Sequence, residues 1–138
     1  MKKILLIILI VFSGLCLNAQ SNLDSLFTVW ENATYPDSIR AQAFSDYIFE
    51  GYFNSDPDNA ILLTNQLFEF TQNANYKIGS VDALTSLGYT YFRIGEYFKA
   101  LDAYQRGLKI AEEIDYKYGT ASILEKIGFI YHDNSDLM

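Results

Sequence analysis

Two segments of the chain carry the same pattern at a fixed distance of 40 residues. The first reads Leu84-x-x-Leu87-Gly88-x-x-Tyr91 and the second reads Leu124-x-x-Ile127-Gly128-x-x-Tyr131. A similar lead-in precedes each of them, Tyr76-Lys77-x-Gly79 and Tyr116-Lys117-x-Gly119. A fixed period of 20–50 residues is the signature of a fold in which one small structural unit stacks on the next. We therefore expect a repeat architecture.

A fainter copy of the unit lies another 40 residues towards the N-terminus. Phe44 stands where Leu84 does and Ala60 where Ala100 does, whereas Ile48 replaces the glycine. Terminal repeats are often atypical because they cap the stack. We accordingly divide the chain into a capping helix at 20–35 and helical repeats at 36–138, the last of them incomplete.

Within each unit the apolar residues follow helical spacing. They recur in steps of three and four from Val81 to Ile94 and start again after Gly95, which can end a helix in the left-handed conformation. In the earlier unit Asp56 is suited to cap a helix and Pro57 to its first position. No segment shows a sustained strand alternation. The predicted fold is all-α, with antiparallel helix pairs and about five helices after residue 19.

Small residues inside these helices indicate close helix crossings. A glycine within a helix costs about 1 kcal/mol relative to alanine, so Gly88 and Gly107 need a packing reason. Larger side chains are expected to fill the space around the crossings. The predicted packing residues are Leu84, Leu87, Gly88, Tyr91, Ala100, Tyr104, Leu124, Ile127, Gly128 and Tyr131.

The pattern Leu84-x-x-Leu87-Gly88-x-x-Tyr91, followed by Ala100 and Tyr104, resembles the tetratricopeptide repeat signature. Leu84 stands in place of the usual Trp, the closing proline is missing, and the period is 40 rather than ~34 residues. Longer helices account for the difference. The resemblance implies an α-solenoid in which the first helix of each pair lines a concave face that binds a protein or peptide.

Residues 1–19 have the layout of a secretory signal peptide. Lys2 and Lys3 precede a short apolar run and a small residue, Ala19, at the expected cleavage site. The apolar run is shorter than the roughly 20 residues that span a bilayer. Leu15 before Cys16 does not fit a lipoprotein cleavage site. We expect export to the periplasm or the extracellular space, and a mature chain without cysteine.

The third unit reaches the end of the sequence after its first helix. We expect the apolar side of that helix, formed by Ile123, Ile127 and Ile130, to be partly uncovered. The interpretation we favour is that the chain is a fragment of a longer protein, tethered to the membrane by a region beyond residue 138. A partner, or a second copy associating through this helix, is the alternative.

The sequence contains no recognisable catalytic, cofactor or metal site. His132 is the single histidine, which excludes a two-histidine metal site within one chain. The acidic run Glu112-Glu113-x-Asp115 lacks the ligand spacing and the glycine of a calcium loop. The ten basic residues are scattered and the formal net charge is −7, which argues against nucleic acid. No small-molecule substrate is evident, and the chain as given is expected not to be an enzyme.

The most concrete functional expectation is a protein-binding groove. Residues beside the packing stripe of the first helices include aromatic side chains that packing does not require, and Tyr and Arg are enriched among binding hot spots. The candidate groove residues are Tyr52, Thr85, Tyr89, Phe92, Arg93, Phe129 and His132.

A second and weaker resemblance concerns the order of signal peptide and repeats. It is similar to the extracytoplasmic N-terminal regions of bacterial signalling proteins, whose output domain is often a class III adenylate or guanylate cyclase or a histidine kinase. It implies an exported interaction module that forms the sensory part of such a protein. The alternatives are that the intact protein is such an enzyme, or that the chain is a free-standing periplasmic scaffold.

Overall fold

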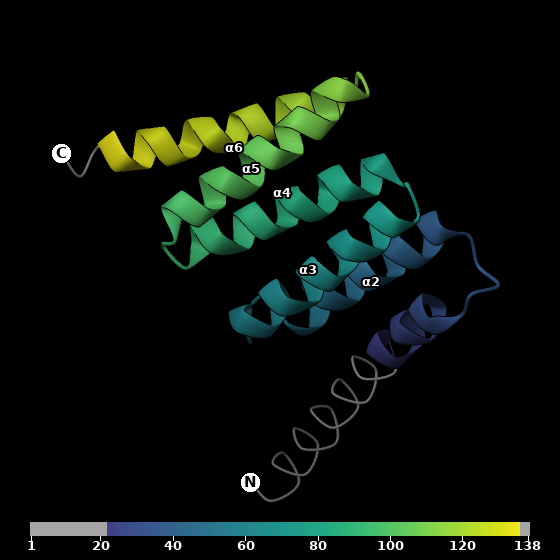
Figure 1. Ribbon diagram of the computed structural model, residues 1–138. Coiled ribbons are helices and arrows are strands. Elements are labelled where there is room, and N and C mark those ends of the chain that lie inside the picture. The colour runs from purple at the N-terminus through teal and green to yellow at the C-terminus, as the bar shows by residue number, and fades with distance from the viewer. Residues whose placement is uncertain (1–21, 136–138) are drawn as a thin grey trace, which may run out of the picture.

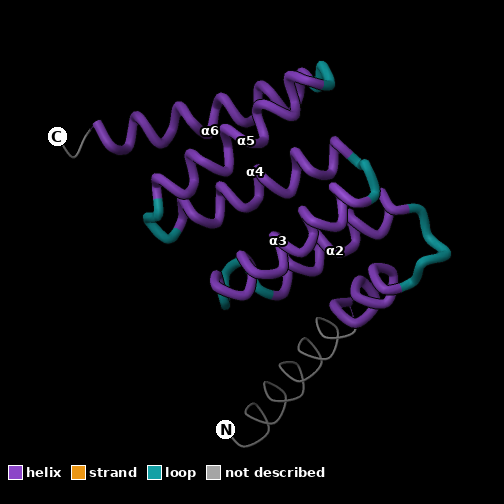
Figure 2. Tube along the Cα trace, in the orientation of Figure 1, coloured by secondary structure: helices purple, strands orange, loops and turns teal. Residues whose placement is uncertain are grey.

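The computed structural model describes residues 22–135, and the proposed signal peptide lies outside the described residues. Residues 22–31 form a first helix. Five helices follow: α2 (Asp37–Gly51), α3 (Pro57–Asn73), α4 (Lys77–Arg93), α5 (Tyr97–Glu113) and α6 (Lys117–Ser135). The described part of the chain is thus all-α, without a strand, as predicted (Figures 1 and 2). It contains six helices, one more than the approximate number expected.

Helices α2 to α6 begin at residues 37, 57, 77, 97 and 117, so each starts 20 residues after the one before. The last three turns are built alike. Gly95 has φ of 80°, and Asn75 and Asp115 have φ of 53°. In each turn, the residue after the one with positive φ donates its backbone N–H to the carbonyl five positions earlier. These donors are residues 76, 96 and 116, and the N–O distances are 2.8–2.9 Å. This is the Schellman arrangement, which satisfies otherwise unpaired carbonyls at a helix end. The 40-residue period is therefore two helices of equal spacing.

Two local predictions about helix ends are confirmed. Gly95 follows the C-terminus of α4 in the left-handed conformation. Asp56 precedes α3, and its carboxylate accepts a hydrogen bond from the Asn59 N–H at 3.2 Å, with Pro57 at the first helical position. A side-chain oxygen at this place pairs one of the donors that the helix itself leaves free.

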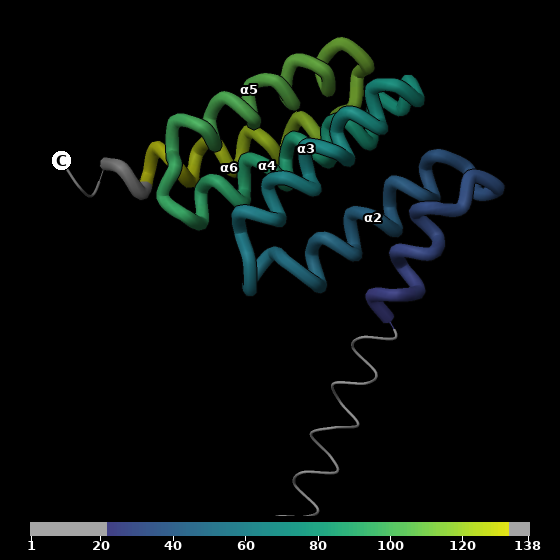
Figure 3. The backbone as a smooth tube through the Cα atoms, turned by 60° about the horizontal axis from the view of Figure 1, so that its bottom comes forward, coloured from purple at the N-terminus to yellow at the C-terminus, as the bar shows by residue number. Residues whose placement is uncertain are grey.

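Consecutive helices pack antiparallel, and alternate helices form two layers. Helix α2 contacts α4, and α4 contacts α6, whereas the backbones of α3 and α5 lie farther apart and these helices meet through a long side chain, the Arg106 guanidinium 5.2 Å from the centre of the Phe68 ring. The helices of the first layer therefore lie closer together, and the stack bends towards α2, α4 and α6. Figure 3 shows this succession from a second side, with the 22–31 helix beside α2.

The first helix closes the N-terminal end of the stack. Trp30 is buried and stacks on Phe44 of α2, with ring centres 4.1 Å apart, and meets Phe70 of α3 edge-on at 4.6 Å. The Arg40 guanidinium lies over both the Trp30 and the Phe70 ring, and its Nε donates to the Trp30 carbonyl at 3.0 Å. The expected cap at 20–35 thus contains a helix at 22–31, and aromatic packing holds it.

The crossing of α4 and α5 shows why two glycines lie inside helices. A Cβ atom on Gly88 would lie 2.5 Å from Cε1 of Tyr104, whose side chain is fully buried. A Cβ on Gly107 would lie 3.1 Å from Cδ1 of Ile123 and 3.3 Å from Cβ of Leu84. Both glycines therefore allow neighbouring helices to approach closely, as predicted. The glycine of the lead-in, Gly79, is also required by close packing, because a Cβ there would overlap the Tyr76 ring.

The side of α6 that is uncovered is not the one expected. Ile123 and Ile130 are fully buried, because they face α5 and the core it shares with α4, and of the three residues expected to be partly uncovered only Ile127 is half-buried. Leu124, Gly128 and Tyr131 are exposed instead, so the prediction that these three are packing residues is wrong for the described chain. In α4 the equivalent residues are Leu84, Gly88 and Tyr91, and the glycine among them receives the Tyr104 ring from α5. The expectation failed because each first helix has two apolar faces, one towards the preceding helix and one towards the next.

Candidate functional site

Three aromatic side chains occupy the same repeat position in the layer formed by α2, α4 and α6, which we call the inner layer. Phe49 of α2, Tyr89 of α4 and Phe129 of α6 are spaced 40 residues apart, and all three are exposed. Phe49 and Tyr89 line one cavity together, and Tyr89 and Phe129 line the next. We call these three residues the aromatic column. It runs across the helices from one unit to the next.

The column is extended by stacked rings and cations. Phe53 stacks on both Phe49 and Tyr89, with ring centres 5.1 Å and 5.3 Å away and interplanar angles of 28° and 17°. The guanidinium of Arg93 lies 4.6 Å from the centre of the Phe53 ring, and Lys126 Nζ lies 6.0 Å from the centre of Tyr89. These distances fall in the range of cation–π attraction.

The position of Arg93 is fixed by further hydrogen bonds. Its Nη1 atom donates to the Phe53 carbonyl at 3.2 Å and to Asn54 Oδ1 at 2.9 Å. The end of α4 is thereby tied to the segment after α2. The partners are neutral groups, so the positive charge of Arg93 is oriented by them but not neutralised.

A cavity of about 300 Å³ lies between α2 and α4 beside the column. We call it the aromatic cavity. Its volume is at the lower end of the range for small ligand sites. Its apolar walls come from α2, the segment after it, α3 and α4, and short polar side chains complete the lining. The lining residues are Ser45, Asp46, Ile48, Phe49, Phe53, Thr64, Leu67, Ser86, Tyr89 and Thr90.

A second cavity of about 130 Å³ lies between α4 and α6. Tyr89, Phe92 and Phe129 supply its aromatic lining, and Tyr104 reaches it from α5. Burial raises the pKa of the Tyr104 hydroxyl, with a smaller contribution from Tyr89. Glu125 and Lys126 of α6 line the same cavity. This cavity therefore carries one charge of each sign.

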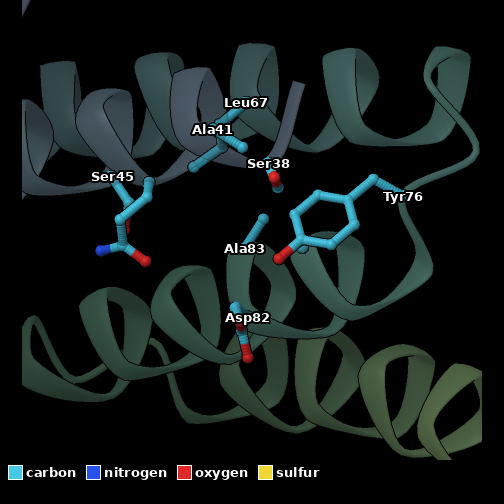
Figure 4. Close-up of a pocket in the computed structure, with 9 residues that line it drawn as sticks. Ser38, Ala41, Ser45, Leu67, Tyr76, Asp82 and Ala83 are labelled. Atoms are coloured by element: carbon cyan, nitrogen blue, oxygen red, sulfur yellow. The ribbon is translucent and has the colours of Figure 1, made fainter. Parts of the chain in front are cut away.

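A small polar pocket of about 30 Å³ adjoins the aromatic cavity, because Ser45 and Leu67 line both. Figure 4 shows Tyr76 and Asp82 on one side of this polar pocket and Ser38, Ala41 and Ser45 on the other. Desolvation raises the pKa of the Asp82 carboxyl. Two different pockets thus lie along the seam between α2 and α4, one aromatic and one polar.

The structure brings together four of the seven predicted groove residues. Tyr89, Phe92 and Phe129 line the second cavity, and Arg93 lies beside Phe53 in the stack. Thr85 is half-buried, and its hydroxyl donates to the Val81 carbonyl at 2.8 Å. His132 is exposed on α6.

Tyr52 lies apart from this group, against the first helix. Its hydroxyl is 2.9 Å from that of Tyr47, and both residues line a cavity with Phe27. The hydrogen bond to Tyr52, together with burial, raises the pKa of Tyr47 to about 12. Tyr52 therefore contributes to the N-terminal packing and not to the aromatic column.

Sequence reasoning missed Phe49, Phe53, Asp46 and Asp82. The signal for Phe49 was present, because subtracting 40 from Tyr89 gives its number. Phe53 occupies the position of Arg93, so the repeat correspondence changes residue type there and gives no guidance. The two aspartates follow no repeat pattern, since Ser86 and Ser122 stand at the positions that correspond to them in the next units.

The described residues contain neither a metal-binding cluster nor a membrane-spanning helix. Within residues 22–135, histidine, cysteine and carboxylate side chains do not form a group of three or more that could hold a metal ion. Among the helices of that range, none has the length and apolar character needed to cross a membrane. Comparison with protein-family models, with curated proteins and with solved structures gave no match.

Proposed function

We propose that this chain is an exported interaction module of the tetratricopeptide type, which binds a protein or peptide along the inner layer formed by α2, α4 and α6. The observation that carries this proposal is the aromatic column. Three units place an exposed aromatic side chain at the same position, and cavities lie between them. Exposed aromatic side chains beside pockets are common anchors for partner residues.

The packing within the stack supports the choice of an interaction surface. In the unit formed by α4 and α5, the signature residues Gly88 and Tyr104 pack against each other where the two helices cross. The column is made from other positions. A change there would alter the surface while leaving the crossings intact, which is how repeat proteins vary their partners.

We further propose that the module is the sensory region of a larger membrane-tethered signalling protein. The support is the layout of residues 1–19 and the order of signal peptide and repeats in the sequence. Sequencing the gene beyond the codon for Met138 tests this directly. An open frame that continues into an apolar span and an output domain is the expected result, and a stop codon contradicts it.

The binding proposal is tested with a random peptide library displayed on phage and selected on the immobilised chain. Selected peptides are then titrated against two matched variants, Tyr89→Ser in the column and Phe98→Ser on α5. Phe98 is the control because it is 91% exposed but belongs to the other layer. We expect Tyr89→Ser to weaken binding about tenfold or more and Phe98→Ser to leave it unchanged. Peptides that respond equally to both variants would contradict the proposal.

A further inference from the structure

The aromatic cavity contains a polar group that the fold does not use. Thr64 is only 2% exposed and lines the cavity from α3. The Thr64 hydroxyl makes no hydrogen bond to the described residues. By contrast, the hydroxyls of Thr71 and Thr90 donate to carbonyls of their own helices. Among the described residues no fully buried side-chain oxygen or nitrogen lacks a hydrogen-bond partner, so the Thr64 hydroxyl, which makes no hydrogen bond within the described chain, is open to the cavity and can take a partner there. A ligand atom in the cavity could supply one for Thr64.

The same seam carries two carboxylates. Asp46 lines the aromatic cavity and Asp82 lines the adjoining polar pocket. Asp46 accepts a hydrogen bond from Gln42 Nε2 at 2.9 Å, which is a neutral donor. The ion pairs found among residues 22–132 involve other residues, namely Asp37, Glu96 and Asp102 with their basic partners. A cation brought to this seam would therefore meet negative charge that the described chain leaves uncompensated.

Among the described residues, no lysine or arginine lines the aromatic cavity or the polar pocket, although Arg93 and Lys126 lie against two rings of the cavity wall. Arg93 is held on Phe53 and lies seven residues beyond Ser86 on α4, which is roughly 10 Å along the helix axis. Lys126 approaches Tyr89 from α6 and lines the second cavity with Glu125. The charged residues that line the two pockets are thus Asp46 and Asp82, both acidic, in a chain whose formal net charge is −7.

We propose that the seam between α2 and α4 binds a peptide in which a tyrosine or tryptophan stands beside a lysine or arginine. The ring enters the aromatic cavity against Phe49, Phe53 and Tyr89, and its polar atom reaches the Thr64 hydroxyl. The basic side chain follows the seam to Asp46 or Asp82. This inference rests on the proposed function and names the partner chemistry of the same surface. Asp82 is exposed where it lines the polar pocket, so a basic side chain can reach its carboxylate.

The test uses the Tyr89-dependent peptides from the library selection, labelled with fluorescein and titrated by anisotropy. We expect these peptides to be enriched in an aromatic residue next to a basic one. Replacing the basic residue with glutamate should weaken binding by about tenfold or more, as should Asp46→Asn or Asp82→Asn in the protein. Glu112→Gln is the matched control, because it removes a carboxylate from the exposed end of α5. It should change affinity less than twofold.

The ring's polar atom is tested separately with Thr64→Val, which keeps the shape and removes the hydroxyl. Peptides with Tyr or Trp should lose affinity, and the same peptides with Phe should not. Peptides that depend on Tyr89 but bind both Asn variants as well as they bind the original chain would overturn this inference and leave the proposed function standing. If selection gives no Tyr89-dependent peptide, the proposed function itself fails.

Discussion

Helices α4 and α6 carry the same sequence pattern in different surroundings. On α4, Leu84 is fully buried, and Gly88 lies directly under the Tyr104 ring. On α6, the equivalent Leu124 is 52% exposed, and a Cβ added to Gly128 would meet no atom within 4 Å. The comparison separates what a residue's identity implies from what its neighbours make of it. A glycine under a ring is required by packing, whereas the same glycine on an open helix face only lowers the stability of the helix.

The largest expected effect comes from the leucine pair. Leu84→Ala removes a fully buried side chain and should lower the free energy of unfolding by about 2–5 kcal/mol. Leu124→Ala should change it by less than about 0.5 kcal/mol, because half of that side chain is in solvent. Urea unfolding followed by circular dichroism measures both. Equal losses would show that α6 is covered in solution, for instance by a second copy of the chain.

Alanine substitutions at Gly88 and Gly128 are expected to change the free energy of unfolding in opposite directions. Gly88→Ala places a methyl group against the buried Tyr104 ring, and we expect a net loss of about 1–3 kcal/mol. Gly128→Ala meets open space and should gain up to about 1 kcal/mol from helix propensity. The same urea titrations report both signs. A loss at Gly128 would indicate that this face is occupied.

The turns provide a smaller test of equivalence between units. Gly95→Ala forces an alanine into φ of 80° and should cost about 1 kcal/mol, although its Cβ would have free space. Asp115→Gly makes the opposite change at the corresponding turn after α5, where φ is 53°, and should be neutral or slightly stabilising. Thermal unfolding of both variants checks this. A stabilised Gly95→Ala variant would mean that the turn can rearrange.

The smallest expected effect concerns Asp82, where the next unit has Ser122. Asp82 is exposed, but partial desolvation of its carboxyl raises its pKa in the folded chain, so the folded state favours the protonated form. Its contribution to stability is therefore present at acid pH and is lost as the pH rises above the ordinary Asp value of about 3.9. Asp82→Ser should stabilise the chain at pH 7 by about 0.5 kcal/mol or less and have no effect near pH 3. A larger benefit at pH 3 would contradict this sign.

Much of the fold could be predicted because its determinants are local. The turn at Gly95, the cap at Asp56 and the close approach at Gly88 each depend on a residue type whose backbone or size leaves few alternatives. The periodicity of the apolar residues predicts which sides of each helix are apolar. It could not say which neighbouring helix covers which side, and for that reason Ile123 and Ile130 were expected to be uncovered.

The candidate site was less predictable because it depends on contacts between units. Tyr89 and Phe129 could be recognised as aromatic residues outside the packing stripe, but Phe53 joins them only through ring stacking across α2 and α4. Tyr52 looked equivalent to the groove residues, yet its hydroxyl pairs with Tyr47 under the first helix. Side-chain partners of this kind are set by tertiary structure.

Contacts between helices in this stack are confined to near neighbours along the chain, with α2 reaching α4 and α4 reaching α6. Low contact order of this kind favours rapid folding, because few long loops must close before contacts form. It also means that local opening need not be uniform. Trp30 packs one end of the stack against two helices, whereas α6 contacts only α5 and α4 among the described helices. Backbone amides should therefore lose their protection against hydrogen exchange first in α6, and successively later towards α2.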